Sequence, residues 1–299
     1  TTFTVSKYAF AYFTPVYMIA FRFTIGVLAM CIFFWKKISK ITLKDLKGGI
    51  FSKECCGLNP FKLCFAFVDQ VNGKGLDLYS YTNVTGIKLN AKHEVEGVET
   101  DKGFIGTKRI VNCAGVWANE VGRMAGIETP VQPRKGVILI SGASFPFCNQ
   151  KVQEFGYMIS KFSEFECKRD PDVEKYNVAF TIEPEAGNNV LIGSSRNFSD
   201  ISFNTEIEII HAIAKRAIRF YPILKELNCI RSYAGVRPFM DDHLPLITEV
   251  EKVPGYFIAT GHEGDGISMA PMTGRLIAEL LAGEKPYLDL TPFNYKRLS

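Results

Sequence analysis

The chain has 299 residues, which is enough for two packed domains or one large one. It carries 35 Lys and Arg residues against 31 Asp and Glu residues, and this net charge of +4 is too small and too scattered to indicate nucleic acid binding. The eight cysteines show no C-x-x-C spacing and there are only four histidines, so a zinc site is not expected and reduced thiols in a cytoplasmic setting are favoured.

Residues 15–35 form an almost uninterrupted apolar run of about the length that crosses a bilayer, with Arg22 as its only charge. A cluster of lysines follows directly: Lys36, Lys37, Lys40, Lys44 and Lys47. Positive charge after an apolar span predicts that the rest of the chain stays on the cytoplasmic side. We therefore expect an uncleaved membrane anchor in residues 1–48, with a buried helix of a soluble protein as the alternative.

Residues 59–113 have the pattern of a globular domain. Asn59 and Pro60 suit the cap and first turn of a helix that ends near Gly73, and strands are expected at 76–89, 95–100 and 104–113, the last two joined by a hairpin turn at 101–103. Residues 117–124 are expected to be helical.

Residues 131–202 alternate with period two and contain turn signals such as 185–188, which predicts a mostly antiparallel sheet. Residues 205–221 then read as a helix with an apolar face that carries Ile207, Ile210, Ala214, Ala217 and Tyr221. No internal repeat or low-complexity tract interrupts this region.

Residues 255–283 are the most informative stretch. The run 256–260 predicts an inner strand, Gly261, Gly264 and Gly266 allow a tight turn and the close approach of a ligand, and a helix is expected from an N-cap at Ser268 to a stop at Gly283. The helix start would place positive charge beside the turn. A tight connection that binds no ligand is equally consistent with this spacing, because the order is G-x-x-G-x-G and not G-x-G-x-x-G.

The motifs GVRPFMDDHLPLI (235–247) and YFIATGHEGDGISMAPMTGRLIAELL, together with RIVNCAGVWANEVGRMAG (109–126), PVQPRKGVILIS (130–141) and VLIGSSRNFSD (190–200), resemble the FAD-dependent D-amino acid oxidase-like superfamily. The most similar types are the sarcosine oxidase beta subunits, glycine oxidases and D-hydroxyproline dehydrogenases. Residues 13–47 resemble the start of a drug/metabolite transporter. The simplest account is a transporter fragment joined near residues 48–52 to a flavoenzyme whose beginning is missing.

This resemblance implies an α/β (α+β) fold: a truncated FAD-binding domain of the glutathione-reductase type at 49–130 and 231–299, and an antiparallel-sheet substrate domain at 131–230, after one transmembrane helix. The family's G-x-G-x-x-G loop does not occur in the 299 residues. The cofactor positions that the resemblance implies are Val84, Gly115, Gly261, His262, Gly264, Gly266 and Ile267.

Arg237 and His262 are the catalytic candidates. By resemblance, Arg237 holds the carboxylate of the substrate, which suits a planar, permanently charged guanidinium. A structural ion pair of Arg237 with Asp241 or Asp242 is the alternative. His262 would lie beside the flavin ring, or be a hydrogen-bonded core residue. Tyr157 and Arg196 are further candidates for substrate contact.

Two hypotheses about function follow. The first is a FAD-dependent oxidoreductase that takes a hydride from the carbon beside the nitrogen of an amino acid or secondary amine, because a flavin does not need a protein nucleophile. The second is an inactive remnant or interaction subunit that cannot hold FAD by itself. A partner subunit that supplies the nucleotide cradle or accepts electrons is possible in either case.

Overall fold

The computed structural model describes residues 48–54, 57–159, 171–198 and 200–298. Residues up to Gly57 belong to a separate unit, and Leu58–Ser299 form the unit described below. The expected membrane span at 15–35 and the transporter-like segment at 13–47 lie outside the described residues. Within the described residues, no helix combines the length and the apolar character that crossing a bilayer requires.

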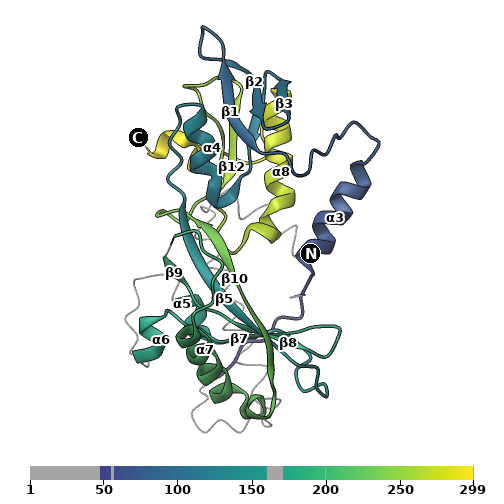
Figure 1. The fold of residues 1–299 in the computed structure, drawn as a ribbon, viewed down its shortest axis with the longest axis vertical. Coiled ribbons are helices and arrows are strands. Elements are labelled where there is room, and N and C mark those ends of the chain that lie inside the picture. Colours follow the sequence, from purple (N-terminus) through teal and green to yellow (C-terminus); the bar gives the residue numbers. More distant parts are fainter. Residues whose placement is uncertain (1–47, 55–56, 160–170, 199, 299) are drawn as a thin grey trace. The chain divides into compact units, whose positions relative to one another are not determined.

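Helix α3 (Pro60–Val71) begins at the predicted cap, where the Asn59 side chain accepts a hydrogen bond from the backbone N–H of Lys62 at 3.1 Å. None of its residues is buried, and Phe61 and Phe65 are 72% and 66% exposed. In Figure 1 the helix projects beside α8 (Gly266–Ala282). The apolar side chains of α3 are therefore not covered by other described residues.

Three antiparallel strands follow: β1 (Val84–Leu89), β2 (Val95–Thr100) and β3 (Gly103–Gly106). The predicted hairpin turn joins β2 to β3, with Gly103 at φ +131°. The prediction of a strand over 76–89 was wrong for residues 76–83. Asp101 explains the late start, because its carboxylate accepts hydrogen bonds from both the backbone N–H and the side-chain amide of Asn83, at 3.0 Å each, and holds this residue in the preceding loop.

The predicted single strand over 104–113 is divided into β3 and β4 (Ile110–Asn112). Between them, the Thr107 hydroxyl donates to the carbonyl of Arg109 at 3.0 Å and accepts from its N–H at 3.2 Å, which turns the chain out of the first sheet. β4 pairs in parallel with β12 (Tyr256–Thr260), and β12 pairs in antiparallel with β11 (Leu246–Glu249). β12 is thus the inner strand that its composition predicts.

The helices beside this small sheet are η1 (Gly115–Trp117), α4 (Ala118–Met124) and α8, followed by η3 (Thr291–Phe293) and η4 (Tyr295–Leu298). The predicted N-cap at Ser268 was wrong: α8 begins at Gly266 after Asp265, and the Ser268 hydroxyl donates to the Asp265 carbonyl at 2.9 Å. The helix ends as predicted, with Gly283 in the left-handed conformation at φ +73°.

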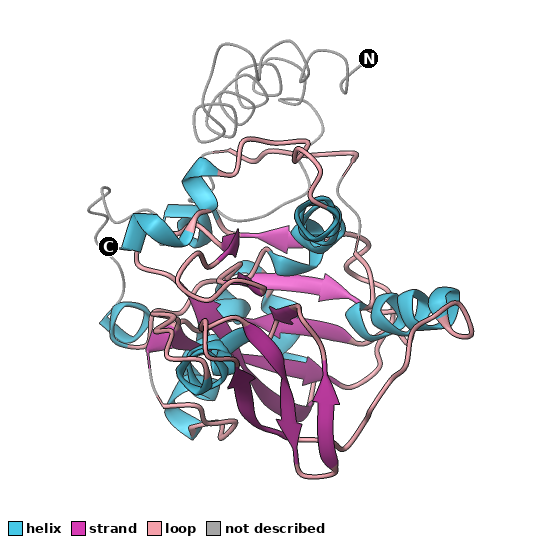
Figure 2. Cartoon of the chain, turned by 90° about the horizontal axis from the view of Figure 1, so that it is seen from above, coloured by secondary structure: helices cyan, strands magenta, loops and turns pink. Residues whose placement is uncertain are grey.

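The larger sheet has the strand order β10-β5-β8-β7-β6, with β9 paired to β5, and all of its pairs are antiparallel, as predicted. Its strands are β5 (Gln132–Ser141), β6 (Val152–Gln153), β7 (Thr181–Pro184), β8 (Val190–Gly193), β9 (Asn197–Phe198) and β10 (Cys229–Phe239). Seen from above, these strands lie together with helices around them (Figure 2). β10 runs across residue 230, where the domain boundary is predicted.

Helix α7 (Ile207–Phe220) covers this sheet, and α5 (Phe155–Ile159), α6 (Pro171–Lys175) and η2 (Pro222–Glu226) complete the region. The core contains Val137, Leu139, Phe180, Ile182, Ile209 and Ile213. Ile207 was predicted on the apolar face of α7, and in the structure it is 69% exposed. It is the first helical residue, and Glu206 before it pairs with the buried Lys135 at 2.6 Å, which orients the first turn.

Candidate active site

The carboxyl ends of the two parallel strands β4 and β12 lie next to each other and carry two of the predicted glycines. Gly115 follows β4 at φ +58°, and Gly261 follows β12 at φ +86°. The Thr260 hydroxyl donates to the Gly115 carbonyl at 3.1 Å and joins the two strand ends. Ligands of sheets with parallel strands usually bind at the carboxyl ends of the strands. Gly115 and Gly261 therefore lie where a ligand is expected to bind.

The glycine turn, residues 261–266, is fixed at both ends. A Cβ atom at Gly261 would lie 2.6 Å from Met240 Cγ, and the positive φ also excludes most side chains there. The backbone N–H of Glu263 donates to the carbonyl of Pro238 at 3.1 Å. Because Pro238 belongs to β10, this bond attaches the turn to the larger sheet.

A cavity of about 290 Å³ lies behind the turn, between the strand ends and α8. It is lined by Val111, Cys113, Ala259, His262, Gly266, Ala270, Thr273, Gly274 and Ile277. The side of α8 that faces it carries small residues at four-residue spacing: Gly266, Ala270 and Gly274. A Cβ atom at Gly266 would stand 3.4 Å from His262 Cβ, so the glycine keeps this end of the cavity open.

His262 lines this cavity from the turn. Its Nε2 atom lies 2.9 Å from the hydroxyl of Thr273 on α8. Burial lowers the pKa of the imidazole because the charged form loses hydration. His262 therefore presents a neutral ring to the cavity at physiological pH.

Arg237 lies on β10 and its side chain folds across β5. A Cβ atom at Gly136 would be 2.2 Å from Nη1 and 2.6 Å from Nη2 of Arg237, so the guanidinium rests directly on this glycine. A Cβ atom at Gly264 would be 3.6 Å from Arg237 Nε, which places the arginine beside the glycine turn. Burial lowers the pKa of Arg237, with smaller opposing effects from neighbours that include Tyr157, but an arginine remains charged.

The two carboxylates proposed as structural partners of Arg237 are engaged elsewhere. Asp241 accepts a hydrogen bond from the Gln132 side chain at 2.8 Å. Asp242 forms an ion pair with Arg297 at 2.5 Å. Nη1 of Arg237 donates a long hydrogen bond of 3.4 Å to the carbonyl of Ser195. The arrangement thus favours the interpretation of Arg237 as a ligand-binding group.

Residues that the sequence reasoning missed surround Arg237. Gly136 supplies the space for its guanidinium, and an isolated glycine inside a strand is a recognised sign of such close approach. Arg134 lies opposite Arg237 in the β5–β10 pairing and forms an ion pair with Glu263 of the glycine turn at 3.2 Å. Nothing in the local sequence pattern indicated that pair. Arg196, a candidate for substrate contact, lies over the ring of Tyr157 at 3.7 Å.

The structure brings most of the predicted residues to the turn at 261–266: Gly261, His262, Gly264, Gly266 and Ile267 belong to the turn or the start of α8, Gly115 is joined to Thr260, and Arg237 of the larger sheet lies next to Gly264. Val84 is not among them, since it begins β1 in a different sheet. Ile267 is the second residue of α8 and is 45% exposed.

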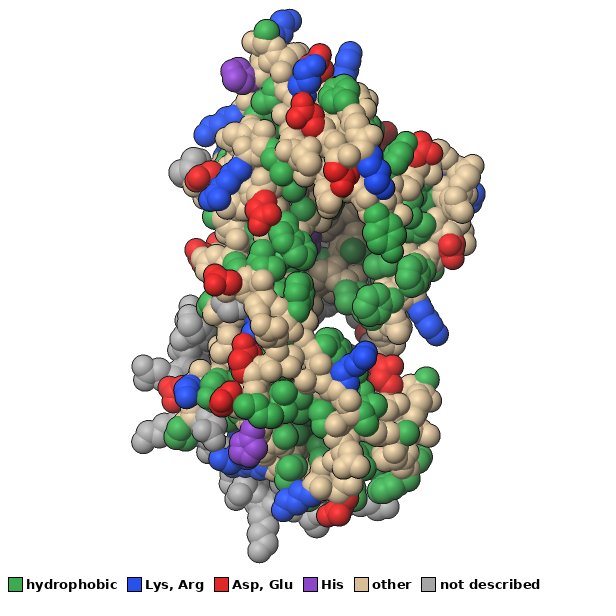
Figure 3. Space-filling view, viewed as in Figure 1, with side chains coloured by type: hydrophobic (Ala, Val, Ile, Leu, Met, Phe, Trp, Pro, Cys, Tyr) green, Lys and Arg blue, Asp and Glu red, His purple; other side chains and the backbone are tan. Residues whose placement is uncertain are grey.

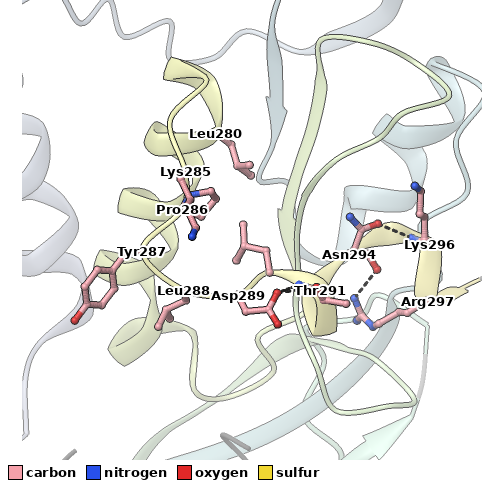
Figure 4. Close-up of a pocket in the computed structure, with 11 residues that line it drawn as sticks. Leu280, Lys285, Pro286, Tyr287, Leu288, Asp289, Thr291, Asn294, Lys296 and Arg297 are labelled. Atoms are coloured by element: carbon pink, nitrogen blue, oxygen red, sulfur yellow. Dashed lines mark hydrogen bonds between the residues drawn. The ribbon is translucent and has the colours of Figure 1, made fainter. Parts of the chain in front are cut away.

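A larger cavity of about 940 Å³ lies at the carboxyl-terminal end of the chain and is drawn in Figure 4. Its polar groups are used within the protein: the Asp289 carboxylate accepts from the N–H and hydroxyl of Thr291, and Arg297 binds Asp242 and the carbonyl of Leu244. None of the predicted site residues lines it. We therefore place the candidate site at the smaller cavity, which His262 and Gly266 of the glycine turn line, whereas Arg237 reaches the same turn at Gly264 and does not line the cavity.

The family model for FAD dependent oxidoreductases (DAO) matches residues 35–280. The chain belongs to this family. It is 32% identical over 244 residues to hydrogen cyanide synthase subunit HcnC of Pseudomonas protegens, covering 81% of this chain and 53% of that protein. It is 27% identical to glycine oxidase of Geobacillus kaustophilus, covering 86% of this chain and 62% of that protein. The resemblance read from the motifs is confirmed, and so is FAD as the cofactor of the family.

Solved structures agree. The crystal structure of L-proline dehydrogenase from P. horikoshii matches with a TM-score of 0.68 and 27% identity, covering 80% of this chain and 59% of that one. Glycine oxidase from Geobacillus kaustophilus matches with a TM-score of 0.64 and 26% identity, covering 78% and 56%. The chain therefore spans between about half and three fifths of the length of these relatives.

The residues present fit one end of FAD. The cavity of about 290 Å³ is close to the lower limit of roughly 300 Å³ for ligand pockets, so it would admit a part of a dinucleotide and not the whole. Gly266 and Gly274 line the cavity without side chains and so leave room for that part. The pyrophosphate of a dinucleotide usually rests on a G-x-G-x-x-G loop, a motif that the 299 residues do not contain.

Proposed function

We propose that this chain forms the substrate-binding and flavin-facing part of a FAD-dependent oxidoreductase that acts on the CH–NH bond of an amino acid or a secondary amine. One observation carries the proposal: Arg237 rests on Gly136 beside the glycine turn, while Asp241 and Asp242, the two carboxylates considered as its structural partners, interact with Gln132 and Arg297. A charged guanidinium in that position is suited to a substrate carboxylate.

Different residues of the chain would bind the substrate and the cofactor. Arg237 binds the substrate carboxylate through two N–H groups and so fixes the carbon that carries the amine. Gly115, Gly261, Gly264, Gly266 and Ile267 would line the cofactor's position, with the neutral His262 as a hydrogen-bonding group that adds no charge. When bound, FAD accepts the hydride from the carbon beside the nitrogen. The substrate loses that hydride and one N–H proton, and water then converts the C=N product to a carbonyl compound and a free amine.

The names of the relatives support this substrate class. Glycine oxidase and L-proline dehydrogenase are named for small amino acids with a primary and a secondary amine, respectively. Sarcosine dehydrogenase of Homo sapiens, 24% identical over 86% of this chain, is named for an N-methyl amino acid. All three substrates carry one carboxylate next to the carbon that bears nitrogen, which is the group that Arg237 would hold.

The proposal also includes a second polypeptide segment that completes the cofactor site. β4 pairs with β12 on one side, and no other described strand pairs with it on the other. Exposed apolar side chains lie on α3 and on β3, among them Phe61, Phe65 and Phe104, and Figure 3 shows hydrophobic side chains gathered around a hollow on this face. Apolar surface of this kind is typical of an interaction site. Without such a segment, an inactive interaction subunit is the competing function.

The visible flavin spectrum of the purified chain separates these functions. We expect FAD to bind more weakly than to longer relatives, because the pyrophosphate contacts are missing from this chain. Flavin retained in part, and reduced by glycine, N-methylglycine or proline with a dye as acceptor, would support the enzyme. A stoichiometric flavin band after gel filtration would contradict the need for a second segment, and no flavin binding even with excess FAD would favour the interaction subunit.

We further propose that residues 15–35 anchor the chain in a membrane, with the main domain in the cytoplasm, and a cytoplasmic protein without an anchor as the alternative. The apolar run and the lysines after it support the anchor. The full-length chain should then sediment with membranes and resist alkaline carbonate extraction. Recovery in the soluble fraction would contradict it.

A further inference from the structure

Two arginines stand opposite each other on one face of the sheet. Arg134 of β5 and Arg237 of β10 are paired residues in the antiparallel register, so their side chains leave the same face. The Arg237 guanidinium rests on Gly136, which is two residues from Arg134 and on the same face. Like charges in directly opposed positions are destabilising unless a counterion lies between them.

The counterion comes from the glycine turn. Oε2 of Glu263 lies 3.2 Å from Nη1 of Arg134, and the two side chains are only 10% and 7% exposed. The other oxygen, Oε1, lies 2.7 Å from Nδ1 of His243. Glu263 itself is at φ +50°, in the left-handed region. The turn that faces the proposed cofactor position therefore inserts a carboxylate next to one arginine and leaves the other available.

Arg134 retains capacity for a second anion. Its guanidinium lies near the rings of Phe239 and Phe198, at 4.9 and 5.5 Å. Its Nε atom is buried and has no hydrogen-bond partner among the described residues. Since a guanidinium can hold a carboxylate through two N–H groups, the single bond to Glu263 uses only part of what Arg134 can donate.

We propose that Glu263 is a specificity-determining residue that restricts the site to substrates with a single carboxylate. The proposal rests on the proposed function, in which Arg237 binds that carboxylate. Glu263 occupies the position at Arg134 that a second substrate carboxylate would take. A dicarboxylate would meet the negative charge of Glu263 instead of an available arginine, and the repulsion would disfavour its binding.

The test is Glu263→Gln in the full chain, titrated with acetate and malonate as one-carboxylate and two-carboxylate probes and followed by calorimetry. In the unaltered chain we expect malonate to bind no more tightly than acetate. In Glu263→Gln, malonate should bind at least tenfold more tightly while the affinity for acetate changes less than twofold. The double variant Glu263→Gln with Arg134→Met should lose the gain, because the second anchor is gone.

Glu251→Gln is the matched control, since Glu251 is an exposed carboxylate that pairs with Lys296 and its removal changes the net charge equally. Any one of four results would overturn the proposal. These are tighter malonate binding in the Glu251→Gln control, tighter malonate binding that persists in the double variant, no tighter malonate binding in Glu263→Gln, and no acetate binding in the unaltered chain. If Glu263→Gln does not fold, Glu263→Asn replaces it, because it also removes the charge and asparagine tolerates the positive φ of this position. Malonate affinity should rise at least tenfold in this variant too, and no rise would overturn the proposal. Flavin content and turnover test the proposed function separately.

Discussion

Gly136→Ala should remove carboxylate binding without unfolding the protein. The added methyl carbon would stand 2.2 Å from Nη1, 2.6 Å from Nη2 and 2.7 Å from Cζ of Arg237. Nonbonded heavy atoms are ordinarily about 3.5 Å or more apart, so the guanidinium has to move by more than about 1 Å. A shift of that size breaks the geometry that a two-bond pair with a carboxylate requires.

The two effects differ in magnitude. The lost charge-assisted pair is worth roughly 1.5–3 kcal/mol, which corresponds to about a 10- to 150-fold rise in KM for amino-acid substrates. The stability should change little, because the clashing atoms are the far end of a flexible side chain. Moving Arg237 to a strained rotamer costs about 0.5–1.5 kcal/mol, whereas replacing glycine by alanine restricts the unfolded chain and returns about 0.4–1 kcal/mol.

Gly235→Ala is the matched control for Gly136→Ala. Gly235 lies directly opposite Gly136 in the register, and a Cβ atom there would have no heavy atom within 4 Å. The measurements are the KM for an amino acid in the flavin-loaded enzyme and the melting temperature of each variant. An unchanged KM in Gly136→Ala, or an equal rise in Gly235→Ala, would refute the reasoning. A stability loss above about 3 kcal/mol would show instead that the strand itself is disrupted.

Three further predictions concern other parts of the site and fold. Arg237→Lys should raise KM strongly for amino acids and less for amines without a carboxylate, because an ammonium group cannot reproduce the two-bond geometry of a guanidinium. The melting temperature should change little. An equal rise in KM for both substrate types would indicate a structural role for Arg237. Gly274→Ala should stabilise the protein by about 0.5–1 kcal/mol in urea denaturation, because alanine favours the helical conformation of α8. It should also reduce flavin retention, because the added methyl group enters the cavity. Full flavin retention would place the cofactor elsewhere. Burial raises the pKa of Asp242, but the hydrogen bonds from Arg297 and the Leu244 N–H outweigh this effect and hold the pKa below its usual value of 3.8. The Asp242–Arg297 ion pair therefore stabilises the fold at neutral pH, and this stabilisation is lost as the pH falls through the lowered pKa. Arg297→Met should therefore be less stable than the unaltered chain at pH 7 and approach it in acid denaturation below about pH 3.8, whereas a constant difference would contradict the assignment.

The sequence predicted correctly those elements that depend only on residues close together in the chain. The cap at Asn59, the inner strand at 256–260 and the stop at Gly283 each depend on residues within a few positions, and the structure has all three. The predicted strands failed where a distant or polar side chain intervened. Asp101 holds Asn83 outside β1, and Thr107 turns the chain between β3 and β4.

The candidate site shows the same limit. Glycines and an arginine are visible in a sequence, and the turn at 261–266 was found from them. The contact of Arg237 with Gly136 and the pair between Arg134 and Glu263 depend on the register of two strands and on a turn 129 residues away from Arg134 in the chain. The spacing of residues within a short motif does not show which residues of two distant strands are paired.

The choice between two interpretations of Arg237 shows what the structure adds. From the sequence, a contact with the substrate carboxylate and a structural ion pair with Asp241 or Asp242 were the two interpretations of Arg237. β10 ends at Phe239, so both aspartates lie beyond the strand that carries Arg237. The two carboxylates reach Gln132 and Arg297, while the guanidinium of Arg237 lies over Gly136 and next to Gly264. Glu263, one of two carboxylates whose charge acts on the half-buried Arg237, is already shared by Arg134 and His243. This is the physical argument for the proposal that the Arg237 guanidinium serves a ligand, which the KM measurements on Gly136→Ala and Arg237→Lys test.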